Sequence, residues 1–124
     1  MLEHLRVRAA AALAQPQTVT LTTCGPADIQ RDVLACRSLG ERIYLLVPRT
    51  SDQLLNIEQS ETVLLTAPAW KLRGKASILP EGGIPAELQA NPLPESAWSV
   101  WVEVTPLRLT LFDATKKWFE TIDF

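Results

Sequence analysis

Apolar and polar residues alternate strictly over residues 70–79, and this pattern limits the fold more than any other feature of the sequence. A period of two residues is that of a β-strand with one buried side and one solvent-facing side. The expected buried side carries Trp70, Leu72, Gly74, Ala76 and Ile78, and the opposite side carries Lys71, Arg73, Lys75 and Ser77. The chain must therefore supply other strands with which this one can pair.

Five further segments also predict strands, and they span residues 18–23, 29–37, 41–48, 61–67 and 98–112. Residues 43–47 are apolar on both faces, which indicates a central strand that is covered from both sides. The connections between the segments are too short for the crossovers that parallel strands need. We therefore expect a mainly β fold in which six antiparallel strands form a small barrel.

The last of these strands changes its pattern in the middle, at Thr105-Pro106. Before this point the apolar residues have even numbers, and after it Leu107, Leu109 and Leu111 have odd numbers. A bulge or bend at Pro106 would return both sets to the same core face. Such a break is what a strand needs in order to turn the corner of a barrel.

Two helical segments accompany the strands. Residues 1–15 carry apolar residues at helical spacing up to Pro16, which predicts a short amphipathic N-terminal helix. A second, inserted helix is expected over residues 52–59, because Thr50 and Gln53 have the spacing of a capping box with Thr50 as the N-cap. The expected apolar face of this helix comprises Leu54, Leu55 and Ile57.

The length of 124 residues predicts a single domain over residues 1–124. Residues 80–97 are rich in proline and glycine and predict a loop, either a functional flap or a mobile excursion, with one helical turn at residues 86–90. Residues 113–124 are expected to form a C-terminal tail.

Charge and cysteine content limit the partners of the protein. Twelve Lys and Arg against fourteen Asp and Glu give a formal net charge of −2, which argues against tight non-specific binding to nucleic acid. No apolar run approaches the roughly 18 residues of a membrane span. Cys24 and Cys36 would lie about 25 Å apart on the first hairpin, too far for a disulfide. We therefore expect two free thiols and a cytoplasmic protein that binds neither nucleic acid nor membrane.

The sequence contains no evident acid–base machinery of its own. His4 is the only histidine, so there is no Cys/His cluster for a metal and no histidine to activate a nucleophile. Neither a dinucleotide-binding glycine motif nor a P-loop is present. If the protein catalyses a reaction, we expect the reactive group to come from a bound cofactor.

Three places in the sequence are candidates for binding an anion. The start of the inserted helix offers N–H groups, two hydroxyls and an arginine, and the alternative there is simple capping. The polar side of residues 70–79 is a cationic stripe, and its alternative is a solvated edge face. A third candidate is an arginine on the second strand. These residues are Arg49, Thr50 and Ser51 at the helix, Lys71, Arg73 and Lys75 on the stripe, and Arg31 on the second strand.

The tryptophans indicate an interface. Trp98 and Trp101 have opposite parity, so one of them faces away from the barrel core. Trp118 belongs to an aromatic tail. Because aromatic residues are enriched at interfaces, we interpret this set as a dimer interface with a planar ligand at its edge. The alternative is that the tail folds back on its own core.

The order of these segments is similar to that of a known family. The similar motifs are Thr18-Val19-Thr20-Leu21-Thr22-Thr23, Gly25-Pro26, Arg31-Asp32-Val33-Leu34-Ala35-Cys36, Ile43-Tyr44-Leu45-Leu46-Val47, Thr50-Ser51, Glu61-Thr62-Val63-Leu64-Leu65, Lys71-Leu72-Arg73-Gly74-Lys75-Ala76 and Trp101-Val102-Glu103-Val104-Thr105-Pro106-Leu107-Arg108-Leu109. Over residues 17–112 the chain thereby resembles the pyridoxamine 5′-phosphate oxidase-like, FMN-binding split-barrel family. The resemblance implies a six-stranded antiparallel split β-barrel.

The resemblance also implies a homodimer with two FMN sites at the subunit interface. In the family, the flavin phosphate is held by cations of the second strand and by a Ser-x-Lys segment that opens the helix. These positions correspond to Arg31, Ser51 and Gln53 here. Two expected lysines are missing, since Gln53 and Cys36 stand at their positions. Substitute cations would come from Arg49, Lys71 or Arg73.

Three functions follow from these patterns. The first is an FMN-binding oxidoreductase of an unassigned small molecule; pyridoxamine phosphate is not expected as its substrate, because the family's longer C-terminal segment does not follow Phe124. The second is a split barrel without flavin that acts as a dimeric binding or regulatory module. The third is an unrelated small β-barrel that holds another anionic ligand on the cationic stripe.

Overall fold

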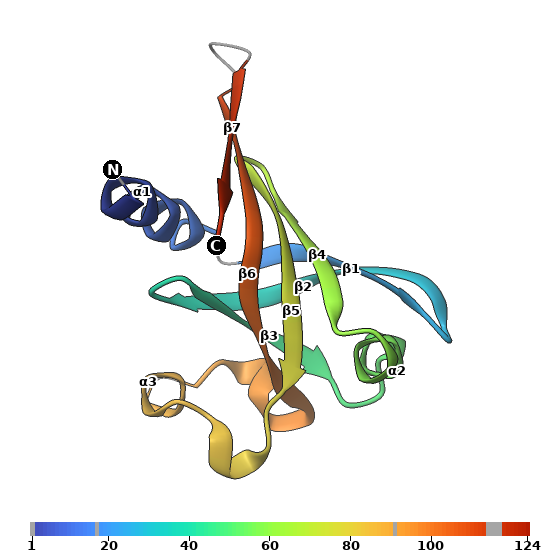
Figure 1. The fold of residues 1–124 in the computed structure, drawn as a ribbon. Coiled ribbons are helices and arrows are strands. Elements are labelled where there is room, and N and C mark those ends of the chain that lie inside the picture. The colour runs from blue at the N-terminus through green and yellow to red at the C-terminus, as the bar shows by residue number, and fades with distance from the viewer. Residues whose placement is uncertain (1, 17, 91, 114–117) are drawn as a thin grey trace.

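Seven antiparallel strands in one sheet dominate the computed structural model, which describes residues 2–16, 18–90, 92–113 and 118–124 (Figure 1). The strand order is β3-β2-β1-β4-β5-β6-β7, and β3 also pairs with β6, so the first six strands close into a barrel. The expected six-stranded barrel is confirmed, and β7 is an additional strand. The strands are β1 (Thr18–Gly25), β2 (Asp28–Leu39), β3 (Arg42–Pro48), β4 (Thr62–Ala67), β5 (Trp70–Ile78), β6 (Ser99–Asp113) and β7 (Trp118–Asp123).

The expected N-terminal and inserted helices are also present. They are α1 (Leu2–Leu13) and α2 (Asp52–Gln59), and three shorter helical stretches lie between β5 and β6: η1 (Glu81–Gly83), α3 (Ala86–Gln89) and η2 (Pro94–Trp98). None of the helices in the described part of the chain combines the length and the apolar character that crossing a lipid bilayer requires.

A bulge lies where the parity of the last strand changes. Arg73 of β5 is opposite Arg108 of β6, but the next residue, Gly74, is opposite Pro106, so Leu107 is the extra residue. A Cβ atom on Gly74 would lie 2.6 Å from Val104 Cγ1 and 2.8 Å from the carbonyl oxygen of Thr105. Only glycine therefore fits at this corner. The predicted bulge at Thr105-Pro106 is confirmed.

The barrel interior is filled by the alternating apolar residues, as the pattern of residues 70–79 predicts. Trp70 is 1% exposed, and its Nε1–H donates a hydrogen bond to the carbonyl oxygen of Ala12 at 3.0 Å. This bond joins β5 to α1, which also buries Ala9 and Leu13 in the same core. Arg8 forms an ion pair of 2.6 Å with Glu120 of β7. The N-terminal helix is therefore docked on the barrel and on its extra strand.

The inserted helix has the expected bounds, but its N-cap lies one residue later than the capping box predicts. Ser51, not Thr50, is the N-cap, and its hydroxyl oxygen accepts a hydrogen bond from the backbone N–H of Gln53 at 3.1 Å. The predicted apolar face is also wrong in part, because Leu55 is 52% exposed. The buried residues of α2 are Gln53, Asn56 and Ile57.

The segment expected as a loop at residues 80–97 covers the outer side of β3 and β6. Leu88 of α3 is 2% exposed and packs with Tyr44, Leu46 and Trp101 in a second apolar cluster, separate from the barrel interior. The predicted helical turn is confirmed as α3. Trp101 is the tryptophan that faces away from the barrel interior, yet this cover buries it to 6% exposure, whereas Trp98 is 60% exposed.

Residues 113–124, expected as a tail, contain the extra strand β7. It pairs with β6 from Asp113 opposite Trp118 to Arg108 opposite Asp123, and Ile122 is buried in the barrel core. The described part of this segment therefore folds back on its own core, which was the alternative to the interface. The side chain of Trp118 lies outside the described residues.

Candidate functional site

Five residues on five neighbouring strands stand directly opposite one another on the outer side of the barrel. Arg31 of β2 is opposite Thr22 of β1, and Thr22 is opposite Leu64 of β4. Leu64 is opposite Arg73 of β5, and Arg73 is opposite Arg108 of β6. The sheet thereby places Arg31 and Arg73, two cations predicted from distant parts of the sequence, in one row that runs around the outside of the barrel.

The outer residues of β5 extend this surface, which we call the cationic face; it comprises Arg31, Lys71, Arg73, Lys75 and Arg108. Lys75 Nζ lies 3.7 Å from Glu61 Oε1, and Arg108 Nε lies 2.7 Å from Asp123 Oδ1. Among the residues that the structure describes, no ion pair involves the other three cations. These three are therefore free to bind an anion.

Exposed apolar side chains border the β2 end of the cationic face. Ile29 is 64% exposed and Val33 is 70% exposed, and each is two residues from Arg31 on the same side of the strand. Contiguous exposed apolar patches are typical of surfaces that meet a ligand or another protein, and Ile29 and Val33 are candidates for part of one. The β2 end thus combines a cation with an apolar surface.

The cations do not converge on one point. Neighbouring strands lie about 4.8 Å apart, so the backbones of Arg31 and Arg73, three strands apart, are separated by roughly 14 Å along the curved sheet, and in the closed six-stranded barrel their outward side chains point in different directions. Lys71 and Arg73 were predicted to take over the role of the two missing lysines. Their positive charges therefore lie at a distance from Arg31. An anionic group on β2 and a second polar group on β5 would be bound by different cations.

The start of α2 lies beside β2. Asp32, the next residue of β2, accepts a hydrogen bond from Gln53 Nε2 at 2.9 Å. Because the Ser51 oxygen already caps the helix, its O–H proton remains available to donate to a ligand. Thr50 is exposed. The structure therefore places the start of α2 next to β2, on the side of the strand that Asp32 faces, which is opposite to the side of Arg31.

Gln53, predicted at the cofactor site, has its amide engaged inside the protein. It is fully buried at the end of the barrel, where its Oε1 accepts a hydrogen bond from Thr23 Oγ1 and its Nε2 donates to the carbonyl oxygen of Leu21 at 3.2 Å and to Asp32. Asn56 continues this network by donating to Thr23 Oγ1 at 3.0 Å. The amide of Gln53 thus anchors α2 to the β1–β2 hairpin, and its assignment to cofactor binding stays a prediction that this structure does not favour.

Cys36, at the other expected lysine position, is also part of the interior. It is 6% exposed, and its Sγ–H donates a hydrogen bond to the carbonyl oxygen of Pro16 at 3.4 Å. Burial raises the pKa of this thiol to about 11. Both Cys36 and Cys24 are free thiols, as expected. The residues at both lysine positions of the resemblance are therefore buried.

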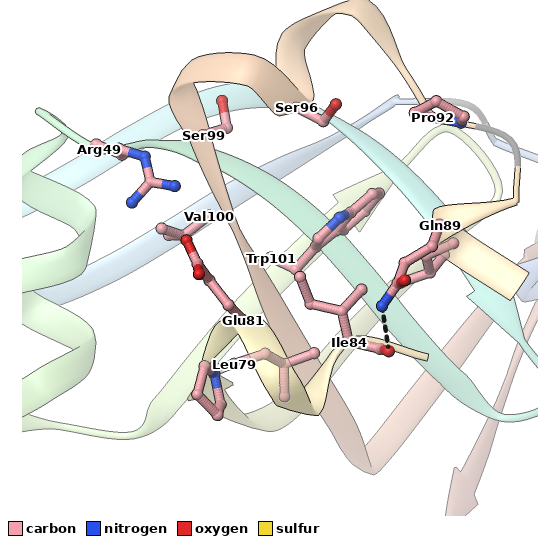
Figure 2. Close-up of a pocket in the computed structure, with 12 residues that line it drawn as sticks. Arg49, Leu79, Glu81, Ile84, Gln89, Pro92, Ser96, Ser99, Val100 and Trp101 are labelled. Atoms are coloured by element: carbon pink, nitrogen blue, oxygen red, sulfur yellow. Dashed lines mark hydrogen bonds between the residues drawn. The ribbon is translucent and has the colours of Figure 1, made fainter. Parts of the chain in front are cut away.

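Arg49 lies away from the cationic face, at the mouth of a pocket on the outer side of β3 and β6 (Figure 2). The pocket has a volume of about 520 Å³ and lies between β6 and the covering segment of residues 80–97. It is lined by Arg49, Leu79, Pro80, Glu81, Ile84, Leu88, Gln89, Pro92, Ser96, Ser99, Val100 and Trp101.

Sequence reasoning missed this pocket, because most of its lining belongs to residues expected as a loop. One signal was present: the odd number of Trp101 in a strand whose core residues are even. An odd-numbered residue in this part of the strand points away from the barrel interior, so the indole of Trp101 needs apolar partners outside the barrel. The second cluster, which includes Leu88, supplies them.

Comparison with solved structures shows that the chain has the split-barrel fold of pyridoxamine 5′-phosphate oxidase-like proteins. A protein of the pyridoxinephosphate oxidase family from Clostridium acetobutylicum, related to general stress protein 26 of Bacillus subtilis, is 12% identical over 98% of this chain and 96% of its own, with a TM-score of 0.70. An FAD-binding protein from Mesorhizobium loti is 10% identical over 83% of this chain and 90% of its own, with a TM-score of 0.62.

An F420 reductase is 20% identical over 80% of this chain and 93% of its own, with a TM-score of 0.61. No protein-family model matches the sequence, and no curated protein matches it either. At these identities the similarity concerns the fold, and the fold implied by the resemblance of residues 17–112 is confirmed.

Proposed function

We propose that the protein is a homodimer that binds FMN at the cationic face and acts as a flavin-dependent oxidoreductase on a small molecule. The observation that carries this proposal is the cross-strand row in which Arg31 and Arg73 stand exposed and without an ion pair among the described residues. Several proteins with this fold, among them an FAD-binding protein and an F420 reductase, support a flavin-type ligand.

The residues at the β2 end fit a phosphate. Arg31 supplies a guanidinium, which binds phosphate with two parallel hydrogen bonds, and the hydroxyls of Thr50 and Ser51 at the start of α2 supply neutral donors. Lys71 and Arg73 lie on β5, three strands further around the barrel, and we propose them as cations for the far end of the ligand. When bound, FMN supplies the redox chemistry, and the cations near its ring orient it and favour negative charge on it.

The exposed apolar residues of β2 support a dimer. Ile29 and Val33 flank the proposed phosphate ligand, and a second copy of the chain would cover them. A planar ring seated between two copies would then be enclosed by apolar side chains and shielded from water. The small-molecule substrate would reach the ring from the open side of this interface.

Titration of the purified protein with FMN, followed by flavin fluorescence, tests the proposal. Arg31→Gln and Arg73→Gln are each expected to weaken binding about tenfold or more, because each removes a charge-assisted hydrogen bond. Arg37→Gln is the matched control, since Arg37 is on the same strand as Arg31 but six residues, or about 20 Å, away. Equal affinity in all four proteins would overturn the assignment of the cationic face.

A flavin-free binding or regulatory dimer is the second candidate. It is favoured by the burial of Gln53 and Cys36 at the two positions where the resemblance expects lysines. Sedimentation analysis of the protein with and without FMN separates the two functions. A dimer that binds no FMN at millimolar concentration would support the second candidate and refute the first.

A further inference from the structure

The pocket beneath residues 80–97 shares no residue with the cationic face, and its chemistry is different. Its floor is apolar: Trp101 and Leu88 are 6% and 2% exposed, and Leu79 and Ile84 pack against the same cluster. A volume of about 520 Å³ lies within the roughly 300–1,000 Å³ of small-molecule sites. The pocket therefore has room and an apolar surface for a small ligand.

Two opposite charges stand at one side of this floor. Figure 2 shows the guanidinium of Arg49 and the carboxylate of Glu81 on the same side of the pocket, with Val100 near both and the indole of Trp101 toward the other side. In the described part of the chain, Arg49 and Glu81 do not form an ion pair with each other or with another residue. Each charge is thus available to a ligand.

Unpaired hydrogen-bonding groups line the pocket as well. Ser99 and Trp101 are both 6% exposed, yet neither the hydroxyl of Ser99 nor the indole N–H of Trp101 makes a hydrogen bond to another described residue. Since no buried side-chain nitrogen or oxygen of the described residues lacks a hydrogen-bond partner, these two polar atoms are themselves accessible to solvent, although their residues are largely buried. The backbone N–H of Arg49 donates to the carbonyl oxygen of Trp98 at 3.1 Å, which holds Arg49 next to Ser99.

We propose that this pocket binds a small zwitterion, an α-amino acid with an apolar side chain. Arg49 and the Ser99 hydroxyl would hold the carboxylate, because a guanidinium and a hydroxyl both donate to it. Glu81 would accept hydrogen bonds from the ammonium group, and the apolar side chain would lie on Trp101 and Ile84. The proposal is independent of FMN binding, since the two sites have no residue in common.

Isothermal calorimetry with L-leucine, L-methionine and L-phenylalanine tests the pocket. We expect binding of at least one of the three, and a loss of about tenfold or more when the same amino acid carries an N-acetyl group or a carboxamide. Arg49→Gln and Glu81→Gln are each expected to weaken binding about tenfold. The matched controls Arg42→Gln and Glu58→Gln change exposed charges elsewhere and are expected to leave binding unchanged.

Ile84→Trp provides a second variant that fills the pocket without altering either charge, and it is expected to abolish binding. Circular dichroism confirms that each variant is folded. Absence of binding for all three amino acids to the folded wild-type chain refutes the proposal. So does an effect of Arg49→Gln without one of Glu81→Gln, which would indicate a carboxylate site rather than a zwitterion site. FMN affinity should not respond to these variants.

Discussion

Replacing Gln53 with alanine gives the sharpest test of how α2 is held. The substitution removes three hydrogen bonds, to Thr23, Leu21 and Asp32, in a side chain that is fully buried. At about 1 kcal/mol for each bond, with about 0.8 kcal/mol for the lost methylene, we expect the free energy of unfolding to fall by about 3–4 kcal/mol. That is a large fraction of the 5–15 kcal/mol typical of a domain.

Urea denaturation followed by tryptophan fluorescence measures this loss. For a urea m value of about 2 kcal/mol/M, the midpoint should fall by about 2 M with little change in slope. Gln59→Ala, at the exposed end of the same helix, is the control and should stay within about 0.5 kcal/mol of wild type. Gln53→Lys, which restores the lysine of the resemblance, should also destabilise the fold and should not improve FMN binding.

A Gln53→Ala midpoint within about 0.3 M of wild type would refute this reasoning, because it would mean that the buried amide does not anchor the helix. An increase in FMN affinity on Gln53→Lys would refute the conclusion that this position is structural.

Three further predictions follow from the packing. Gly74→Ala should cost at least about 2 kcal/mol, because the added methyl meets the Thr105 carbonyl oxygen at 2.8 Å; a melting temperature equal to wild type contradicts this. Leu88→Ala should cost about 2–4 kcal/mol and weaken amino-acid binding, whereas Leu55→Ala, at an exposed site, should have little effect on the urea midpoint. Stability should fall by about 2 kcal/mol between pH 9 and 11, because the pKa of Cys36 is raised to about 11 in the folded state and its thiol ionises earlier when unfolded. A Cys36→Ala variant with the same pH profile as wild type would exclude this cause.

The barrel itself could be predicted from the sequence because strand patterns are local. The alternation of residues 70–79 depends only on a period of two, and the parity change at Pro106 located the bulge before any neighbour was known. Registers that bring Arg31 and Arg73 into one row depend on pairing across the whole sheet, so the sequence alone indicated the residues but not their arrangement.

Local sequence patterns could not predict which polar residues are buried, nor how residues 80–97 pack on the barrel. A glutamine three residues after a capping threonine is typical of a helix start, but at Gln53 the hydrogen bonds to β1 and β2 determine its role. The N-cap is Ser51 and not the predicted Thr50 for the same reason, because tertiary contacts fix the first turn of the helix. Residues 80–97 have no helical or strand period, so their packing on Trp101 could be inferred only from that residue's odd parity.

Strand β6 belongs to both proposed sites, and this has a mechanical consequence. Arg108 lies on its stretch beyond the bulge and Trp101 on its stretch before it, about 23 Å apart at 3.3 Å per residue. The kink at Leu107 therefore sets the angle between the two surfaces. A change at the Leu107 bulge would rotate one surface relative to the other without altering a residue of either. The angle between the two sites would thus be controlled from a position that touches no ligand.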